Sequence, residues 1–129
     1  MLDTDVASFR FKGGLPTSLF ARLVDRQPLI TFVTRAELTK WADLREWGAT
    51  RRARLAHWLA AMAVLPGTED VATTWGRISA AAIRRGRPRP INDTWIAACC
   101  LVYELPLATL NVKDFADFVE YDGLAVISG

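Results

Sequence analysis

The sequence opens with Met1-Leu2-Asp3-Thr4-Asp5-Val6, which places two carboxylates two positions apart in an otherwise apolar stretch. Carboxylates that are partly buried together lose hydration and repel each other, so unpaired they resist ionisation. We interpret Leu2–Val6 as a short central strand, and Asp3 as the first of several acids that meet at its carboxyl end. This interpretation requires the rest of the chain to bring further acids to the same edge.

Composition and length bound the class of protein. The chain has 129 residues, enough for one hydrophobic core, so we expect a single domain spanning 1–129. A hydrophobic content of 51% excludes a disordered chain. No apolar run approaches the roughly 20 residues that span a bilayer, and the first residues lack the layout of a signal peptide. We therefore expect a cytoplasmic protein that has no membrane partner.

The chain alternates apolar β-branched runs with helical periodicity. After a loop at 8–15, the predicted strands are 29–33, 64–65, 107–110 and 124–127. The predicted helices are 17–26, 34–47, 51–63, 69–85 and 92–104, with a short turn or helix at 114–118. Such alternation indicates parallel strands joined by crossover helices. The predicted fold is a three-layer α/β/α sandwich around a central parallel sheet of four to five strands.

Further acids follow the predicted strands, where folds of this class place their sites. Glu37 lies one helical turn beyond the second strand, Asn111 directly follows the fourth, and Asp114 lies three residues later. Asp93 stands at the start of a helix whose amino end can reach the same edge. The sequence therefore predicts that Asp3, Asp5, Glu37, Asp93, Asn111 and Asp114 converge on one rim.

Each of these residues also has a purely local explanation. Thr34 and Glu37 have the spacing of a capping box, in which Glu37 bonds the backbone amide of Thr34. Asn92 or Asp93 can cap a helix, Asp114 can cap a short one, and Asn111 can occupy an ordinary turn. Asp3 is harder to explain this way, because a carboxylate inside an apolar strand needs a partner. The joint pattern carries more weight than any one member.

A divalent cation is the simplest partner for such a cluster, because no Lys or Arg is adjacent in sequence to Asp3 or Asp93. Oxygen-only ligands are what Mg²⁺ and Mn²⁺ prefer. A bound ion of this kind activates water and stabilises charge on a scissile phosphate, which fits phosphodiester hydrolysis.

The net charge of +2 hides an asymmetry. Residues 1–89 hold 15 basic against 8 acidic residues, whereas residues 90–129 hold 1 against 6. A basic body that meets an acidic end is typical of a nucleic-acid surface beside a cation site, although Arg-rich composition alone also serves solubility. The loop before Asp93 carries four arginines that we predict to bind RNA phosphates, namely Arg84, Arg85, Arg87 and Arg89.

Other chemistries have little support. Cys99 and Cys100 are adjacent within a helical pattern, so we interpret them as buried thiols. His57 is the only histidine, which excludes a two-histidine ribonuclease. Trp41, Leu44 and Trp47 at helical spacing, with Trp58 on the next helix, either pack in the core or form a groove for a partner helix.

Four motifs in order make the chain resemble a PIN-domain ribonuclease of the VapC toxin type. They are Leu2-Asp3-Thr4-Asp5-Val6, Ala36-Glu37-Leu38, Asn92-Asp93-x-x-Ile96-Ala97-Ala98 and Thr109-Leu110-Asn111-Val112-Lys113-Asp114-Phe115. The resemblance implies an Mg²⁺-dependent endoribonuclease, the toxin of a toxin–antitoxin system, with Asp3, Glu37 and Asp93 as the core acids. It also implies a homodimer, within a larger toxin–antitoxin assembly, blocked by a cognate antitoxin that lies across the active site.

The chain departs from the family pattern in two places. Asp5 stands where the family commonly has Asn or Ser, which adds charge at the metal. The fourth acidic position is shared between Asn111 at the strand end and Asp114 three residues on. In addition, the chain starts only two residues before Asp3, so a start upstream of Met1 would lengthen the first strand.

Two rival interpretations remain open. A haloacid-dehalogenase-like phosphohydrolase would use Asp3 as nucleophile and Asp5 as acid, but Ala7 replaces the threonine of that motif. A non-catalytic PIN domain that binds RNA or protein would not need the near-complete set of acids.

Overall fold

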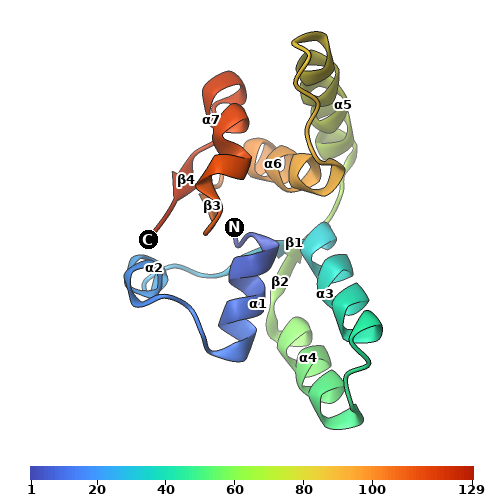
Figure 1. Ribbon diagram of the computed structural model, residues 1–129, viewed down its shortest axis with the longest axis vertical. Coiled ribbons are helices and arrows are strands. Elements are labelled where there is room, and N and C mark those ends of the chain that lie inside the picture. Colours follow the sequence, from blue (N-terminus) through green and yellow to red (C-terminus); the bar gives the residue numbers. More distant parts are fainter.

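The computed structural model describes all 129 residues as an α/β fold in which helices predominate (Figure 1). Seven α-helices and one short 3₁₀ helix surround four strands of two or three residues each. None of the helices combines the length and the apolar character needed to cross a membrane.

The strands form two parallel pairs. They are β1 (Leu29–Thr31) with β2 (Ala63–Leu65), and β3 (Leu107–Ala108) with β4 (Val126–Ile127). Leu29 lies opposite Ala63 in the first pair, and Leu107 lies opposite Val126 in the second. The predicted strands are thus in the expected places, but the pairing is shorter than the apolar runs indicate.

The amino-terminal residues lie between the two pairs and hydrogen-bond to both (Figure 1). The Leu2 N–H donates to the Leu29 carbonyl over 2.8 Å, and the Asp3 N–H donates to the Ala108 carbonyl over 2.9 Å. Leu2 forms only an isolated parallel bridge with Ala108. One continuous sheet of four to five strands is therefore not confirmed, although the opening residues do have the predicted central position.

Helix α1 (Thr4–Lys12) corrects two predictions. The opening strand does not reach Val6, and the segment 8–15 is mostly helix rather than loop. The strand ends at Asp3 because its carboxylate accepts a 2.7 Å hydrogen bond from the Thr4 N–H and begins a helix there. The helix ends at Gly13, whose φ of 79° is the left-handed conformation that glycine adopts without strain.

The remaining helices follow the predicted order. They are α2 (Thr17–Leu23), α3 (Phe32–Leu44), α4 (Ala49–Ala61), α5 (Glu69–Arg84), α6 (Ile91–Tyr103), the 3₁₀ helix η1 (Val112–Phe115) and α7 (Ala116–Asp122). The second strand was predicted to continue to Val33, but α3 begins at Phe32, because the Thr31 hydroxyl accepts from the Thr34 N–H and caps the helix.

Consecutive residues of the central segments face two different cores, as the two-residue period of a strand requires. Met1 and Leu107 belong to a core built with α5, α6 and α7, whereas Leu2 and Ala108 belong to a core built with α1 to α4. The strand pieces thus separate two helical layers. This places the carboxyl ends of the opening segment, β1 and β3 at one edge.

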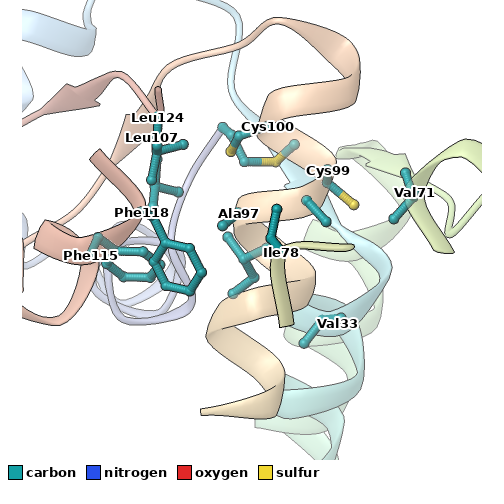
Figure 2. Close-up of a cluster of buried hydrophobic side chains, with 13 residues drawn as sticks. Val33, Val71, Ile78, Ala97, Cys99, Cys100, Leu107, Phe115, Phe118 and Leu124 are labelled. Carbon is teal, nitrogen blue, oxygen red and sulfur yellow. The ribbon is translucent and has the colours of Figure 1, made fainter. Parts of the chain in front are cut away.

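The two cysteines are buried in the first core and face different neighbours (Figure 2). Cys99 lies on the side of Val71, and Cys100 on the side of Leu107 and Leu124. Burial raises the pKa of the Cys99 thiol to about 11 and that of Cys100 to about 12. Both are free and remain protonated, so their interpretation as buried core thiols is confirmed.

Candidate active site

Asp3 lies at the junction between the opening segment and α1, and its side chain is only 6% exposed. One carboxylate oxygen accepts from the Thr4 N–H over 2.7 Å, and the other accepts from the Thr109 hydroxyl over 2.9 Å. Burial raises the pKa of Asp3 to about 6, against the lowering effect of these two hydrogen bonds, and the charges of Asp5 and Glu37 raise it further.

The chain beyond β3 completes the region that we call the acidic corner, around Asp3, Asp5, Glu37, Asp93 and Asp114. Thr109 is fully buried, and its hydroxyl accepts from the Asn111 N–H while donating to Asp3. The Asn111 side-chain amide donates to the Asp5 carboxylate over 2.9 Å. Asn111 is thus directed at Asp5, whereas Asp114 is exposed on η1.

Glu37 lies in the second turn of α3 and is half-buried. The predicted capping box is wrong, because Thr31 caps α3 and Thr34 lies inside the helix. Instead, the Glu37 carboxylate accepts a 2.7 Å hydrogen bond from the hydroxyl of Thr4. The contact joins α3 to the start of α1 and brings Glu37 toward Asp3.

Asp93 is half-buried in the first turn of α6. The local explanation of Asn92 or Asp93 as the helix cap is wrong, since Pro90 occupies that position and no side chain caps the helix. Burial raises the pKa of Asp93 to about 6, and the charges of Asp3, Asp114, Glu37 and Asp5 raise it further. The other four candidate carboxylates therefore lie within electrostatic reach of Asp93.

No cation compensates these five carboxylates. The side-chain ion pairs of the chain all lie elsewhere, between Arg52 and Asp43, Arg87 and Asp117, and Arg89 and Asp122. The donors that contact the candidate acids are hydroxyls, a side-chain amide and a backbone N–H. The acidic corner therefore concentrates negative charge, and only uncharged groups donate hydrogen bonds to its carboxylates.

The donor set suits Mg²⁺ or Mn²⁺, because every candidate ligand offers oxygen. No three of the chain's His, Cys, Asp and Glu side chains are close enough together to form a ready metal cluster. The acids are neighbours electrostatically, but their side chains do not close on one point. A bound ion therefore needs its carboxylates to turn inward or to complete its shell with waters.

A family model described as the PIN domain matches residues 1–120 of this chain. The chain belongs to the PIN-domain family. This confirms the family that the four sequence motifs indicate. The span of 1–129 for the domain stays a prediction.

This PIN domain is similar in sequence and in structure to VapC proteins and VapBC complexes. Ribonuclease VapC5 of Mycobacterium tuberculosis is 34% identical over 107 residues, which cover 81% of this chain and 76% of that relative. Among solved structures, VapBC-1 from nontypeable Haemophilus influenzae matches with a TM-score of 0.82 and 27% identity, covering 99% of this chain and 96% of that one. VapBC2 from Rickettsia felis, bound to a DNA fragment from their promoter, matches with a TM-score of 0.83 and 18% identity, covering 100% and 97%.

The basic loop of this PIN domain mostly contacts its own α7. Arg89 is buried, pairs with Asp122 at 2.5 Å and stacks 4.1 Å from the Phe118 ring centre. Arg87 pairs with Asp117, and Arg85 stacks on Tyr121. Arg84 forms no ion pair and is exposed at the end of α5. The predicted RNA-binding role of these four arginines stays a prediction, and Arg84 is the exposed one that forms no ion pair, side-chain hydrogen bond or ring contact.

Sequence reasoning missed the threonines of the PIN domain's acidic corner. Thr4, Thr31, Thr34 and Thr109 are all 5% exposed or less. The Thr4 and Thr109 hydroxyls donate to acids, and the Thr31 hydroxyl caps α3. The Thr34 hydroxyl contacts that of Thr4. The signal was present in the sequence, because these threonines neighbour the predicted acids or strand ends.

Proposed function

We propose that this PIN domain is a divalent-metal-dependent endoribonuclease and the toxin of a toxin–antitoxin pair. The observation that carries the proposal is a set of five neighbouring carboxylates without an arginine or lysine partner, three of which accept hydrogen bonds from neutral donors only. A structural acid of this chain pairs with arginine, as Asp122 does. Neighbouring acids that have no arginine or lysine partner indicate instead a site that binds a cation.

The residues we propose to hold the ion are Asp3, Asp5, Asp93 and Asn111. Mg²⁺ bound there, with Mn²⁺ as the alternative, supplies Lewis-acid stabilisation of the scissile phosphate and lowers the pKa of a water. Glu37 has one oxygen held by Thr4, so its Oε2 is available to take a proton from the attacking water. Asp114, exposed on η1, is the fourth proposed catalytic acid, after Asp3, Glu37 and Asp93.

The RNA backbone requires positive charge near this acidic corner, and the basic loop precedes Asp93 in the chain. Arg84 and the exposed side chain of Arg87 are the parts of the loop that can contact phosphates. Arg85, Arg87 and Arg89 also shape this surface, since they hold the loop against α7.

The cognate antitoxin is the proposed protein partner. The similar solved structures from Haemophilus influenzae and Rickettsia felis are named as VapBC assemblies. A homodimer is the proposed state of the toxin itself, and Ile83 and Ile91, both 65% exposed, offer apolar surface for it. Light scattering of the purified chain tests the dimer.

The structure disfavours the two rivals. Membership of the PIN family overturns the phosphohydrolase expectation. A non-catalytic domain has no use for buried, unpaired carboxylates, because they destabilise the fold.

The deciding experiment compares Asp93→Asn and Asp3→Asn with Asp25→Asn, a change of an exposed acid away from the corner. Cleavage of single-stranded RNA is measured with Mg²⁺, with Mn²⁺ and with EDTA. We expect the two site variants to lose cleavage while retaining the helical circular dichroism of the parent, and Asp25→Asn to cleave normally. Cleavage that persists in EDTA or in Asp93→Asn would remove the proposal.

A further inference from the structure

A chain of side-chain hydrogen bonds joins α1 to α3 through two buried threonines. The Thr4 hydroxyl oxygen lies 2.9 Å from that of Thr34 and 2.7 Å from a Glu37 carboxylate oxygen. Thr4 is 5% exposed and Thr34 is 0% exposed, so bulk water does not compete for the bond between the two hydroxyls.

The direction of this chain follows from counting protons. A threonine hydroxyl has one proton to donate, and a carboxylate only accepts. Thr4 donates its proton to Glu37, so Thr34 must be the donor to Thr4. The order is therefore Thr34 to Thr4 to Glu37, and each hydroxyl polarises the next.

Thr34 does not use the acceptor that a helical threonine normally has. A hydroxyl inside a helix commonly donates to a carbonyl one turn earlier. Thr39, on the same helix, does so with the Arg35 carbonyl over 2.9 Å. Thr34 instead points to Thr4 on another helix, so its hydroxyl serves the contact between α1 and α3.

We propose that Thr34 is a positioning residue for Glu37 and acts through Thr4. The inference rests on the proposed function, in which Glu37 is one of the active-site acids. The Thr4 hydroxyl holds one carboxylate oxygen of Glu37 without neutralising its charge. This contact restricts the rotation of the Glu37 side chain and therefore the direction of its other oxygen. Thr34 touches neither metal nor RNA in this scheme.

The test uses Thr34→Val, which keeps the shape and leaves the Thr4 proton satisfied by Glu37. Mn²⁺ affinity is measured by titration calorimetry on the purified chain, and kcat and KM are measured on single-stranded RNA. Loss of an outer hydrogen-bonding partner typically lowers metal affinity or activity about 10-fold. We expect the Kd for Mn²⁺ to rise, or kcat to fall, by about that factor, with an unchanged KM for RNA.

Two controls separate positioning from packing. Thr39→Val removes a hydroxyl from the same helix away from the site and should leave all three constants at parent values. Thr34→Ser restores the hydroxyl and should return metal affinity and kcat toward the parent. A Thr34→Val protein that matches Thr39→Val in every constant would overturn the proposal.

The double variant gives the sharpest outcome. If Thr34 acts only through Thr4, then Thr34→Val has no further effect in a Thr4→Val background. Additive losses would show an independent role and overturn the proposal. In the metal-free protein, the effects of Thr34→Val and Glu37→Gln on the urea midpoint must likewise be non-additive in the double variant, which decides the inference even if the parent neither binds Mn²⁺ nor cuts RNA. In that last case the proposed function alone fails.

Discussion

Asn111 and Asp5 are joined by a 2.9 Å hydrogen bond from the side-chain amide to the carboxylate, across 106 positions of sequence. The bond links the strand end after β3 to the first turn of α1, where the opening segment also carries Asp3. An amide rather than a second carboxylate faces Asp5, so the corner keeps one charge fewer. This pairing explains how the chain accommodates a second carboxylate two positions after Asp3.

The first prediction reverses this arrangement with Asn111→Asp. Two carboxylates then face each other in a partly buried corner, and the donor to Asp5 is lost. We expect a lower melting temperature in EDTA, by several degrees for a loss of about 1 kcal/mol, and a larger rise on adding Mg²⁺ than the parent shows. Gln27→Glu, an exposed addition of charge, is the control and should respond to Mg²⁺ as the parent does. An unchanged melting temperature in EDTA would show that the hydrogen bond between Asn111 and Asp5 does not contribute to stability.

The second prediction concerns Asp93→Asn without metal. Burial and the neighbouring acids raise the pKa of Asp93 to about 6, so its ionised form is unfavourable in the folded chain at neutral pH. Replacing it with a neutral isostere should raise the melting temperature in EDTA while abolishing cleavage. Asp25→Asn should leave both unchanged. A destabilised Asp93→Asn protein would contradict the electrostatic account of this corner.

The third prediction is the pH dependence that follows from the same shifts. Asp3 and Asp93 both have pKa values raised from 3.8 to about 6, so between these values the folded chain binds protons that the unfolded chain does not. Their unfavourable contribution is complete above pH 6 and is relieved as the pH falls toward 4. The free energy of unfolding in EDTA should therefore rise as the pH is lowered from 8 to 5.

Urea unfolding at pH 5, 6 and 8 checks this sign. Each pKa unit corresponds to about 1.4 kcal/mol, so buried Asp3 alone corresponds to on the order of 3 kcal/mol in full, of which roughly half is expected between pH 8 and pH 5. The pH slope should be shallower in Asp93→Asn, which lacks one of the two groups. Saturating Mg²⁺ should flatten it, because protons and metal compete for the same carboxylates. A parent protein that becomes less stable from pH 8 to 6 in EDTA would have the opposite sign.

The sequence predicted the order of elements and the acid-bearing strand ends because apolar periodicity and parallel topology are local and general rules. It failed at the opening, where Val6, Ala7 and Phe9 read equally well as strand or helix. A single hydrogen bond from Thr4 to the Asp3 carboxylate settles the choice for helix. The capping box at Thr34 failed for a related reason, since Thr31 competes for the same amide and Glu37 finds a tertiary partner. Hydroxyl directions of this kind depend on which helices pack together, and spacing in the sequence does not encode them.

The fourth prediction separates structural from surface arginines in the basic loop. Arg89 is 5% exposed and its partner Asp122 is 10% exposed, whereas the Arg87 side chain is 62% exposed. Breaking a buried pair leaves an uncompensated charge, so Arg89→Met should lower the free energy of unfolding by about 3 kcal/mol. Breaking an exposed pair matters little, so Arg87→Met should lower it by less than about 1 kcal/mol. Equal losses in urea unfolding would refute the distinction.

The fifth prediction tests the free guanidinium of the loop. Arg84 is exposed at the end of α5 and forms no ion pair, so Arg84→Ala should leave stability unchanged and weaken RNA binding. Binding to single-stranded RNA is measured by fluorescence anisotropy in EDTA, which prevents metal-dependent cleavage, over a range of salt concentrations. Loss of one phosphate contact should flatten the plot of log affinity against log salt by roughly 0.7. Arg77→Ala removes an exposed charge about two turns earlier on the same helix and should keep the parent slope. Equal slopes for Arg84→Ala and the parent would place the RNA away from this end of α5.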